Sequence, residues 1–461
     1  MFVLTITVMD KSKLFGIFMM GFTHFSQYCN ALPNKKTGMK TILTSFLLLL
    51  IIGVRAQLPD QVYMPDIRTV TLTRAGDALS YPIMTLNSGD QLQLDFDDLA
   101  GGYKNLYYSF LLCNTDWSVS NLPSFDYVRG FQSTRITTYR NSSISEIPYT
   151  HYQATIPDRS SVPSRSGNYL LKVFRNNDTS DLLFTKRFLV VDSRVSIAAQ
   201  IKQPFNSQFF LTDQRVQVIV NTANARINTM SPQDLKIVVL QNNIWATAAM
   251  VDRPGIYRGN YFEYNDDLTS FPSGREWRWI DLRSLRLLSD RMDRIVDTAK
   301  RTDVYVKQES QRSQQVYFYY RDQNGRYVIE NTDGNNPLWQ SDYAYVHFSF
   351  APPGGRAFGG KDMYVFGELT NYRADDQSRM VYNADKGVYE STLLLKQGYY
   401  NYSYVIADSR NPALNRYSLD NTEGNFTNTE NVYTVLVYYR GFGSRSDELL
   451  GYTTVSSVIA R

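Results

Sequence analysis

Apolar and polar residues alternate along much of this chain with a period of two, which is the pattern of half-buried β-strands. The run 91–96, Gln-Leu-Gln-Leu-Asp-Phe, alternates without interruption. Tyrosine and β-branched residues are frequent in such runs, as is typical of pleated surfaces. The pattern predicts strands at residues 91–96, 107–113, 169–174, 188–191, 216–220, 235–240, 316–320, 343–350, 393–395, 402–406 and 432–439.

Turn signals separate these strands. Asn324-Gly325 lies between two tyrosine-rich runs, and an Asn-Gly pair favours a tight hairpin because both residues tolerate a positive φ. Strands recur about every eight to twelve residues without a βαβ rhythm, so we expect a mainly β fold of three consecutive antiparallel β-sandwich domains of the immunoglobulin-like kind. Their predicted bounds are residues 57–192, 193–341 and 342–461, and the Gly/Pro-rich stretch 351–355 is interpreted as a loop within the third domain.

One segment has a different period. Residues 282–299 place apolar side chains at helical spacing with charged residues between them, which predicts an amphipathic helix. The flanking runs 277–280 and 304–306 have the pattern of strands, so this helix would be an insertion in a sandwich. The apolar positions are Leu282, Leu285, Leu288, Met292, Ile295, Val296 and Ala299.

The N-terminal region has the pattern of an export signal. Residues 39–56 begin with Met39 and the basic Lys40, continue with an apolar run, and end with small residues at Val54 and Ala56, which predicts a signal peptide cleaved before Gln57. The apolar run is too short for a membrane-spanning helix, which needs about twenty residues, so we expect no direct membrane span. Residues 1–38 are interpreted as a mis-annotated upstream extension; the alternative is a genuine long basic region of the signal.

Removing the leader changes the charge of the protein. Residues 1–56 carry six of the 48 basic residues and one of the 44 acidic residues, so the remaining chain has 42 basic and 43 acidic residues and a net charge of −1. This balance excludes the basic footprint of a nucleic-acid-binding protein. One cysteine remains, Cys113, within an apolar run, where a buried and inert thiol is expected.

Few residues of the predicted mature chain suggest chemistry. His151 and His347 have no nearby histidine or cysteine in the sequence, so each is interpreted as a hydrogen-bonded strand residue and not as a metal ligand. There is no nucleophile elbow, phosphate loop or dinucleotide fingerprint. We therefore expect no catalytic, cofactor-binding or metal-binding residues, no cofactor and no enzyme activity.

Two acidic groups have alternative interpretations. Asp95, Asp97 and Asp98 could hold a hard cation, but no calcium-loop spacing follows, and a solvated strand end is the preferred interpretation. Asp116 beside Trp117 could be a glycosidase carboxylate. We prefer a turn in which Asp116 bonds nearby backbone and Trp117 packs in the first domain.

The third predicted domain resembles an early-set immunoglobulin-like domain of the glycogen-binding type. The resemblance is carried by residues 364–372, 387–390 and 397–404, and it implies a small antiparallel sandwich. Sugar-binding members have a tryptophan where this chain has Tyr372, which weakens the carbohydrate interpretation. Gly398 is expected to allow the turn into its strand.

A second resemblance covers most of the chain. In order along the sequence, several runs resemble the plug protein of the type IX secretion system. This resemblance implies a periplasmic protein, peripheral to the outer membrane, that associates with a very large outer-membrane β-barrel translocon and closes the periplasmic end of its pore when no substrate passes. The runs are 96–99, 113–117, 149–152, 166–174, 279–284, 429–433 and 437–440.

The family has no catalytic residues to transfer, and the residues that bind the partner stay unknown. We expect a monomer within a hetero-complex. The alternative function is a periplasmic or surface carbohydrate-binding protein that uses the third domain. A hydrolase on a sandwich scaffold is a weaker third hypothesis, because the predicted mature chain has two histidines and no recognisable nucleophile.

Overall fold

The computed structural model describes residues 59–299, 301–409 and 417–458. The predicted signal peptide at 39–56 and the upstream stretch 1–38 lie outside these residues. Within the described ranges the chain forms β-strands, loops and single 3₁₀ turns and contains no α-helix, so the mainly β prediction is confirmed. The 3₁₀ turns are η3 (Ser124–Asp126), η4 (Ser207–Phe209), η5 (Pro232–Asp234), η6 (Trp245–Thr247), η7 (Asp267–Thr269), η8 (Pro353–Gly355) and η9 (Glu368–Thr370).

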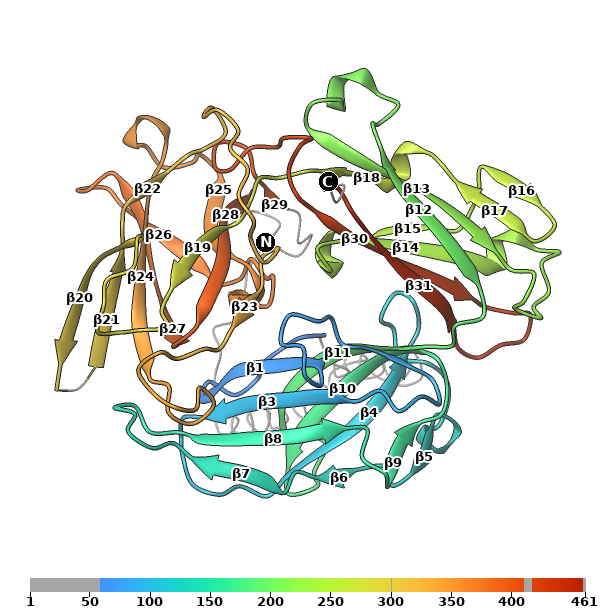
Figure 1. Cartoon of the computed structure of the whole chain (residues 1–461), viewed down its shortest axis with the longest axis horizontal. Helices are drawn as coiled ribbons and strands as arrows, with labels where there is room; N and C mark the ends of the chain where they lie inside the picture. The colour runs from blue at the N-terminus through green and yellow to red at the C-terminus, as the bar shows by residue number, and fades with distance from the viewer. Residues whose placement is uncertain (1–58, 300, 410–416, 459–461) are drawn as a thin grey trace, which may run out of the picture. The chain divides into compact units, whose positions relative to one another are not determined.

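The first sandwich pairs a sheet of order β1-β3-β8-β7 with a sheet of order β2-β11-β10-β4-β6 (Figure 1). The short strands β5 and β9 pair with each other in a separate two-stranded sheet. Its core takes the alternate apolar residues of the predicted strands, such as Leu92, Leu94 and Phe96. The strands are β1 (Ile67–Arg74), β2 (Ile83–Thr85), β3 (Leu92–Asp98), β4 (Leu106–Cys113), β5 (Val128–Gly130), β6 (Thr134–Arg135), β7 (Thr138–Asn141), β8 (Thr150–Ile156), β9 (Ser161–Pro163), β10 (Gly167–Arg175) and β11 (Leu182–Val191).

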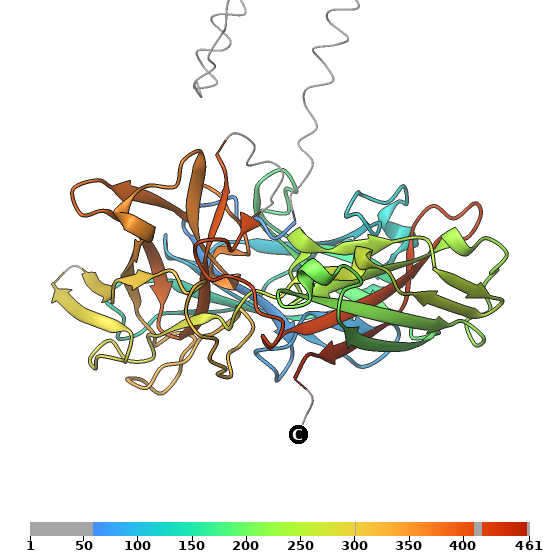
Figure 2. The same cartoon turned by 90° about the horizontal axis from the view of Figure 1, so that it is seen from above.

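The central sandwich is built from two separated stretches of sequence. One sheet has the order β12-β13-β17-β16, with β18 paired to β13, and the other has the order β15-β14-β30-β31. Figure 2 shows the C-terminal strands, in dark red, among the green strands of this domain. The strands are β12 (Ser196–Lys202), β13 (Asp213–Asn221), β14 (Leu235–Gln241), β15 (Ala249–Val251), β16 (Ile256–Arg258), β17 (Tyr261–Tyr264), β18 (Ser270–Pro272), β30 (Val432–Tyr439) and β31 (Glu448–Ser456).

The third sandwich is inserted between β18 and β30, and we call it the inserted sandwich. Its main path, β19-β28-β25-β26-β27-β24-β21-β20, folds back on itself, because Phe348 of β24 contacts Tyr402 of β28 across the core, 5.0 Å between ring centroids. The strands are β19 (Arg278–Asp281), β20 (Met292–Thr298), β21 (Arg301–Val306), β22 (Glu309–Ser310), β23 (Tyr327–Val328), β24 (Tyr343–Ala351), β25 (Lys361–Phe366), β26 (Arg379–Asn383), β27 (Val388–Lys396), β28 (Tyr399–Asp408) and β29 (Tyr417–Ser418).

This topology corrects the predicted domain order. The boundary at 192/193 falls between β11 and β12, but the boundary at 341/342 falls inside the inserted sandwich, and residues 432–456 belong to the central one. The reason lies in β14, which is almost entirely buried and therefore needs a strand partner on each edge. The three-residue strand β15 pairs with one edge, and β30 pairs with the other, where Leu235 lies opposite Tyr439. Three strand pairs are also parallel, β2 with β11 and both β21 and β22 with β24.

The predicted helix at 282–299 is wrong. Residues 282–291 form a loop, and β20 follows as a strand paired with β21. The helical spacing does not correspond to a buried face, because Leu288 and Val296 are exposed whereas Leu282 and Met292 are buried. In this loop the carboxylate of Asp333 accepts hydrogen bonds from Ser284 and from the backbone of Leu285, which favours a turn over a helix.

The predicted strand at 316–320 is absent from every sheet, although its residues run without a turn or bend. The Asn324-Gly325 pair does form a turn in which both residues have a positive φ, 52° and 80°. No hairpin results, because the strand after it, β23, pairs with β28.

Candidate functional site

Buried polar side chains join the first sandwich to the inserted one. Asp97, the second-last residue of β3, is fully buried, and its Oδ1 lies 2.6 Å from Nδ1 of His151 on β8. Its Oδ2 accepts hydrogen bonds of 2.6 Å from Nζ of Lys396 and from the hydroxyl of Tyr343. We call these four residues the aspartate junction.

Electrostatics at the aspartate junction favour the charged forms of Asp97 and His151, but not that of Lys396. Burial opposes ionisation of Asp97, but Lys396 and His151 outweigh it and lower the pKa of the carboxyl group. Burial lowers the pKa of Lys396, although Asp97 acts against this shift. Burial also acts against a charged His151, but hydrogen bonds with Asp95 and Asp97 raise its pKa. One buried carboxylate therefore holds two basic groups.

The interpretation of the acidic cluster as a solvated strand end is wrong for Asp97 and Asp98, which are both fully buried. Strand β3 continues to Asp98, and Tyr343 and Lys396 of the inserted sandwich cover its end. Lys396 is 299 positions away from Asp97 in the sequence, so no local pattern reveals the contact. A weak signal exists, since Lys396 ends a strongly apolar strand. Within the described residues, no group of three or more His, Cys, Asp or Glu side chains could hold a metal ion.

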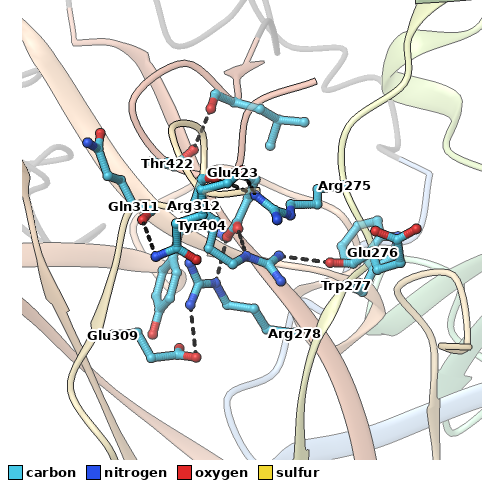
Figure 3. A network of polar contacts seen from close by, with 12 residues as sticks. Arg275, Glu276, Trp277, Arg278, Glu309, Gln311, Arg312, Tyr404, Thr422 and Glu423 are labelled. Atoms are coloured by element: carbon cyan, nitrogen blue, oxygen red, sulfur yellow. Dashed lines mark hydrogen bonds and ion pairs between the residues drawn. The ribbon is translucent and has the colours of Figure 1, made fainter. Parts of the chain in front are cut away.

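A second polar cluster lies where the chain enters and leaves the inserted sandwich (Figure 3). Arg278 of β19 places Nη1 2.9 Å from Glu309 and Nε 2.8 Å from Glu423, and Nε of Arg312 lies 2.6 Å from the other oxygen of Glu423. The guanidinium of Arg278 also lies over the ring of Tyr404, 5.2 Å from its centroid. We call Arg278, Glu309, Arg312 and Glu423 the arginine junction.

Opposite charges at the arginine junction overcome desolvation. Burial would raise the pKa of Glu423, but Arg278 and Arg312 lower it to about 2. Burial would lower the pKa of Arg278, but Glu423 and Glu309 hold it well above its ordinary value. The junction thus remains ionised, and each glutamate accepts bonds from arginine.

Two carboxyl groups beside the arginine junction behave differently. Glu276 is fully buried, accepts a hydrogen bond from the hydroxyl of Tyr317, and has a pKa that burial raises. Burial raises the pKa of Asp322 to about 7, although the backbone N–H groups of Asn324 and Trp277 donate hydrogen bonds to it. The charges of Glu276 and Glu430 add to the shift of Asp322.

The other residues singled out from the sequence have structural contacts. His347 lies 2.7 Å from a carboxylate oxygen of Asp303 and 2.9 Å from the hydroxyl of Thr392, which confirms a hydrogen-bonded strand histidine. Cys113 is buried, and burial raises the pKa of its thiol to about 12, as expected for an inert thiol. Asp116 accepts a hydrogen bond from the backbone of Ser118 within a turn, as predicted.

Trp117 contacts the central sandwich and does not pack only in the first, because its ring centroid lies 4.9 Å from that of Trp245. Near them, a cavity of about 410 Å³ is lined by residues of all three sandwiches, among them Arg187, Trp245, Arg326 and Tyr372. Its arginines already have acidic partners, since Arg187 lies 2.9 Å from Asp60 and Arg326 lies 3.5 Å from Glu368.

Tyr372 stands where sugar-binding early-set domains have a tryptophan. It is half-buried and lies edge-on to Trp277 and Phe366, with ring centroids 6.3 and 5.8 Å away. These contacts make Tyr372 part of a cluster of packed aromatic rings. Gly398 adopts no left-handed φ, but a side chain there would meet the carbonyl oxygen of Val328 at 2.4 Å, so the close approach of β23 requires glycine.

Exposed apolar side chains gather on two loops of the central sandwich. Phe205, Phe209 and Leu211 lie before β13, and Leu268 lies on η7. Asp267 joins the two loops, because its carboxylate accepts hydrogen bonds from the backbone N–H groups of Phe205 (2.8 Å) and Asn206 (3.2 Å). Apolar groups held out by a fixed backbone are typical of a protein-contact surface. We call these four side chains the apolar loops.

Comparisons with known proteins decide the family. Residues 67–192, which span β1 to β11, match the family model described as the type 9 secretion system plug protein 1st domain. The chain belongs to the type IX secretion system plug protein family. A solved structure titled a hypothetical protein from Parabacteroides merdae ATCC 43184 is 31% identical, has a TM-score of 0.82, and is matched over 100% of its own length and 87% of this chain.

The match confirms the resemblance to the plug family within residues 67–192 and indicates a role in type IX secretion. The resemblance of residues 364–404 to glycogen-binding domains stays a prediction. No curated protein matches the chain. None of the helical segments in the described part of the chain is long and apolar enough to cross a membrane.

Proposed function

We propose that this protein is the periplasmic plug of a type IX translocon, which associates with the large outer-membrane β-barrel and closes the periplasmic end of its pore while no substrate passes. The match of residues 67–192 to the first domain of plug proteins is the observation that carries the proposal. The predicted signal peptide at 39–56 supports a periplasmic location.

The junctions between the sandwiches support a closing function. A body that covers a wide pore must keep its form, and the described residues fold as one compact unit. The aspartate junction and the arginine junction are buried, and breaking a buried ion pair costs about 3–5 kcal/mol. These contacts oppose independent movement of the inserted sandwich, so the protein presents one fixed surface to its partner.

Reversible closure also needs a surface that a partner recognises without becoming part of the core. The apolar loops provide exposed aromatic and aliphatic groups beside the charged side chains of Asp267 and Arg215. Apolar anchors within a polar rim are typical of interfaces that form and dissociate.

Two measurements test the proposal. A tagged copy expressed at its native level is purified from the outer membrane in mild detergent, and we expect the large β-barrel to co-purify with it. Deletion of the gene is expected to increase uptake of a large antibiotic such as vancomycin in cells that have the translocon. A strain that also lacks the barrel is the control, and its uptake is expected to be unchanged by the deletion. Equal uptake in deletion and parent strains would contradict closure of the pore.

A further inference from the structure

Residues 316–322 have the sequence of a strand but no strand partner. The segment reads Val-Tyr-Phe-Tyr-Tyr-Arg-Asp and runs without a turn or bend. Within the described chain, no backbone N–H or C=O group of residues 317–321 takes part in a hydrogen bond. Residues of this type favour pleated sheets, so a run of them outside every sheet needs a physical reason.

Side-chain contacts hold the 316–322 segment in place. The hydroxyl of Tyr317 donates to the carbonyl oxygen of Asn428 at 2.9 Å, and that of Tyr319 donates to a carboxylate oxygen of Glu430 at 3.0 Å. The hydroxyl of Tyr320 donates to the carbonyl oxygen of Trp277 at 2.9 Å, beside the residues drawn in Figure 3. Three tyrosine hydroxyls therefore anchor the segment, and Arg275 donates to the carbonyl oxygen of Val316 at its start, while the backbone of residues 317–321 pairs with no described strand.

The apolar side chains on either side of Tyr317 are exposed. Val316 is 91% exposed and Phe318 is 73% exposed. If side chains alternate here as in a strand, Tyr317 and Tyr319 share the row that is fixed to the protein, and Val316 and Phe318 share the other row, which points outward until Tyr320 returns to the protein. Ordering a chain segment costs about 1–2 kcal/mol per residue in conformational entropy. Because the tyrosine contacts already order this segment in the free protein, binding a partner does not incur that cost.

One edge strand elsewhere in the chain shows how charges discourage pairing. The edge strand β20 exposes Asp293, Arg294 and Asp297. The 316–322 segment has no charged residue before Arg321. It thus combines free backbone donors and acceptors with apolar side chains, which is the combination used when a peptide adds a strand to a protein.

We propose that the 316–322 segment receives an extended strand of the translocon by β-strand addition, with apolar side chains of that strand covering Val316 and Phe318. The inference rests on the proposed function for the identity of the partner. Free backbone N–H and C=O groups select a polypeptide as the occupant, because another chain can pair with both kinds of group and a lipid cannot. Residues 426–430 connect the segment to the apolar loops. The carbonyl oxygen of Asn428 accepts a hydrogen bond from Tyr317, and the backbone N–H of Thr427 donates to the carbonyl oxygen of Leu211.

The test compares matched variants of the tagged full chain in its native cells. In Val316→Asn/Phe318→Asn the anchoring tyrosines stay, and we expect the amount of co-purified β-barrel to fall about ten-fold or more. Phe125→Asn is the control, because Phe125 is 74% exposed on η3 of the first sandwich. It is expected to retain the parent level of barrel. Thermal unfolding of both purified variants must match that of the parent.

Hydrogen exchange of the backbone amides separates strand addition from simple apolar contact. In the free protein the amides of residues 317–321 are expected to exchange rapidly, and in the co-purified complex they are expected to slow about 100-fold or more. Parent levels of barrel with the double variant, or unchanged exchange in the complex, would overturn the inference and leave the proposed function standing. Absence of the barrel with the parent protein would overturn both. Slow exchange in the isolated protein together with dimer formation would assign the segment to a second copy and also overturn it.

Discussion

The two buried junctions of the inserted sandwich solve the same problem with different chemistry. The aspartate junction arranges Lys396, His151 and Tyr343 around the single carboxylate of Asp97. In the arginine junction two arginines share two glutamates, and a third arginine, Arg291, lies 2.8 Å from Glu309. One junction is centred on one acid, and the other distributes its charges over several partners.

This difference is visible in the two cations. Burial lowers the pKa of Lys396, because a lysine concentrates its charge on one strongly hydrated nitrogen. Arg278 keeps a pKa well above its ordinary value, since Glu423 and Glu309 outweigh burial and its planar fork bonds both. We infer that the aspartate junction depends on each member, whereas the arginine junction tolerates the loss of one.

The largest expected effect is that of Lys396→Met. This change removes the ammonium group 2.6 Å from the buried carboxylate of Asp97 and leaves His151 as its only basic partner, so the free energy of unfolding should fall by about 3–5 kcal/mol. Urea unfolding of the mature chain at pH 7.5 measures it. Lys386→Met removes an exposed pair with Glu390 and should change the same quantity by less than about 0.5 kcal/mol. A similar small change with Lys396→Met would contradict the dependence of the junction on its lysine.

A smaller loss is expected for Arg278→Met. Glu423 keeps Arg312 and Glu309 keeps Arg291, so neither acid loses every cation. We expect the free energy of unfolding to fall by about 2–3 kcal/mol, the range for lost hydrogen bonds to charged groups. The same urea experiment applies, with the exposed Arg294→Met as control. If Arg278→Met proves more damaging than Lys396→Met, the contrast between the two junctions is wrong.

The smallest expected effect concerns Asp322, beside the arginine junction. Its folded pKa, about 7, lies above the unfolded value, so its contribution to stability is present at low pH and is lost as pH rises through 7. Between pH 8 and pH 6 this group should stabilise the protein by about 1 kcal/mol. Asp322→Asn should remove that part of the pH dependence, whereas Asp376→Asn, at an exposed carboxylate, should leave it. Identical pH profiles for Asp322→Asn and the parent would show that Asp322 is ionised throughout.

Local patterns in the sequence predict the strands well where one face is buried. Strands β3, β4 and β30 lie where apolar residues alternate or cluster with tyrosine and β-branched residues. The predicted helix at 282–299 fails because its apolar positions do not share a buried face: Leu288 is exposed and Met292 is buried. The 316–322 segment shows the converse, since a strand pattern is present but the segment joins no sheet among the described residues.

The candidate site was less predictable. The sequence drew attention to His151 and Asp97, but it offered a metal or solvent for the acidic cluster and did not single out Lys396 or Tyr343. No pattern in the sequence indicated the arginine junction, because Arg278 and Glu423 are 145 positions apart and neither belongs to a motif. Charged residues in a tyrosine-rich chain look like surface residues until their partners are known.

The sequence by itself determined the mainly β class, most strand positions and the family, because alternation and short motifs depend on neighbours along the chain. Only the tertiary structure decided that β30 and β31 complete the central sandwich and that a third sandwich is inserted into it. It also decided that Asp97 meets Lys396 and that residues 316–322 join none of the described sheets. These outcomes depend on which distant surfaces bury one another, and that choice is a property of the whole fold and not of any local pattern.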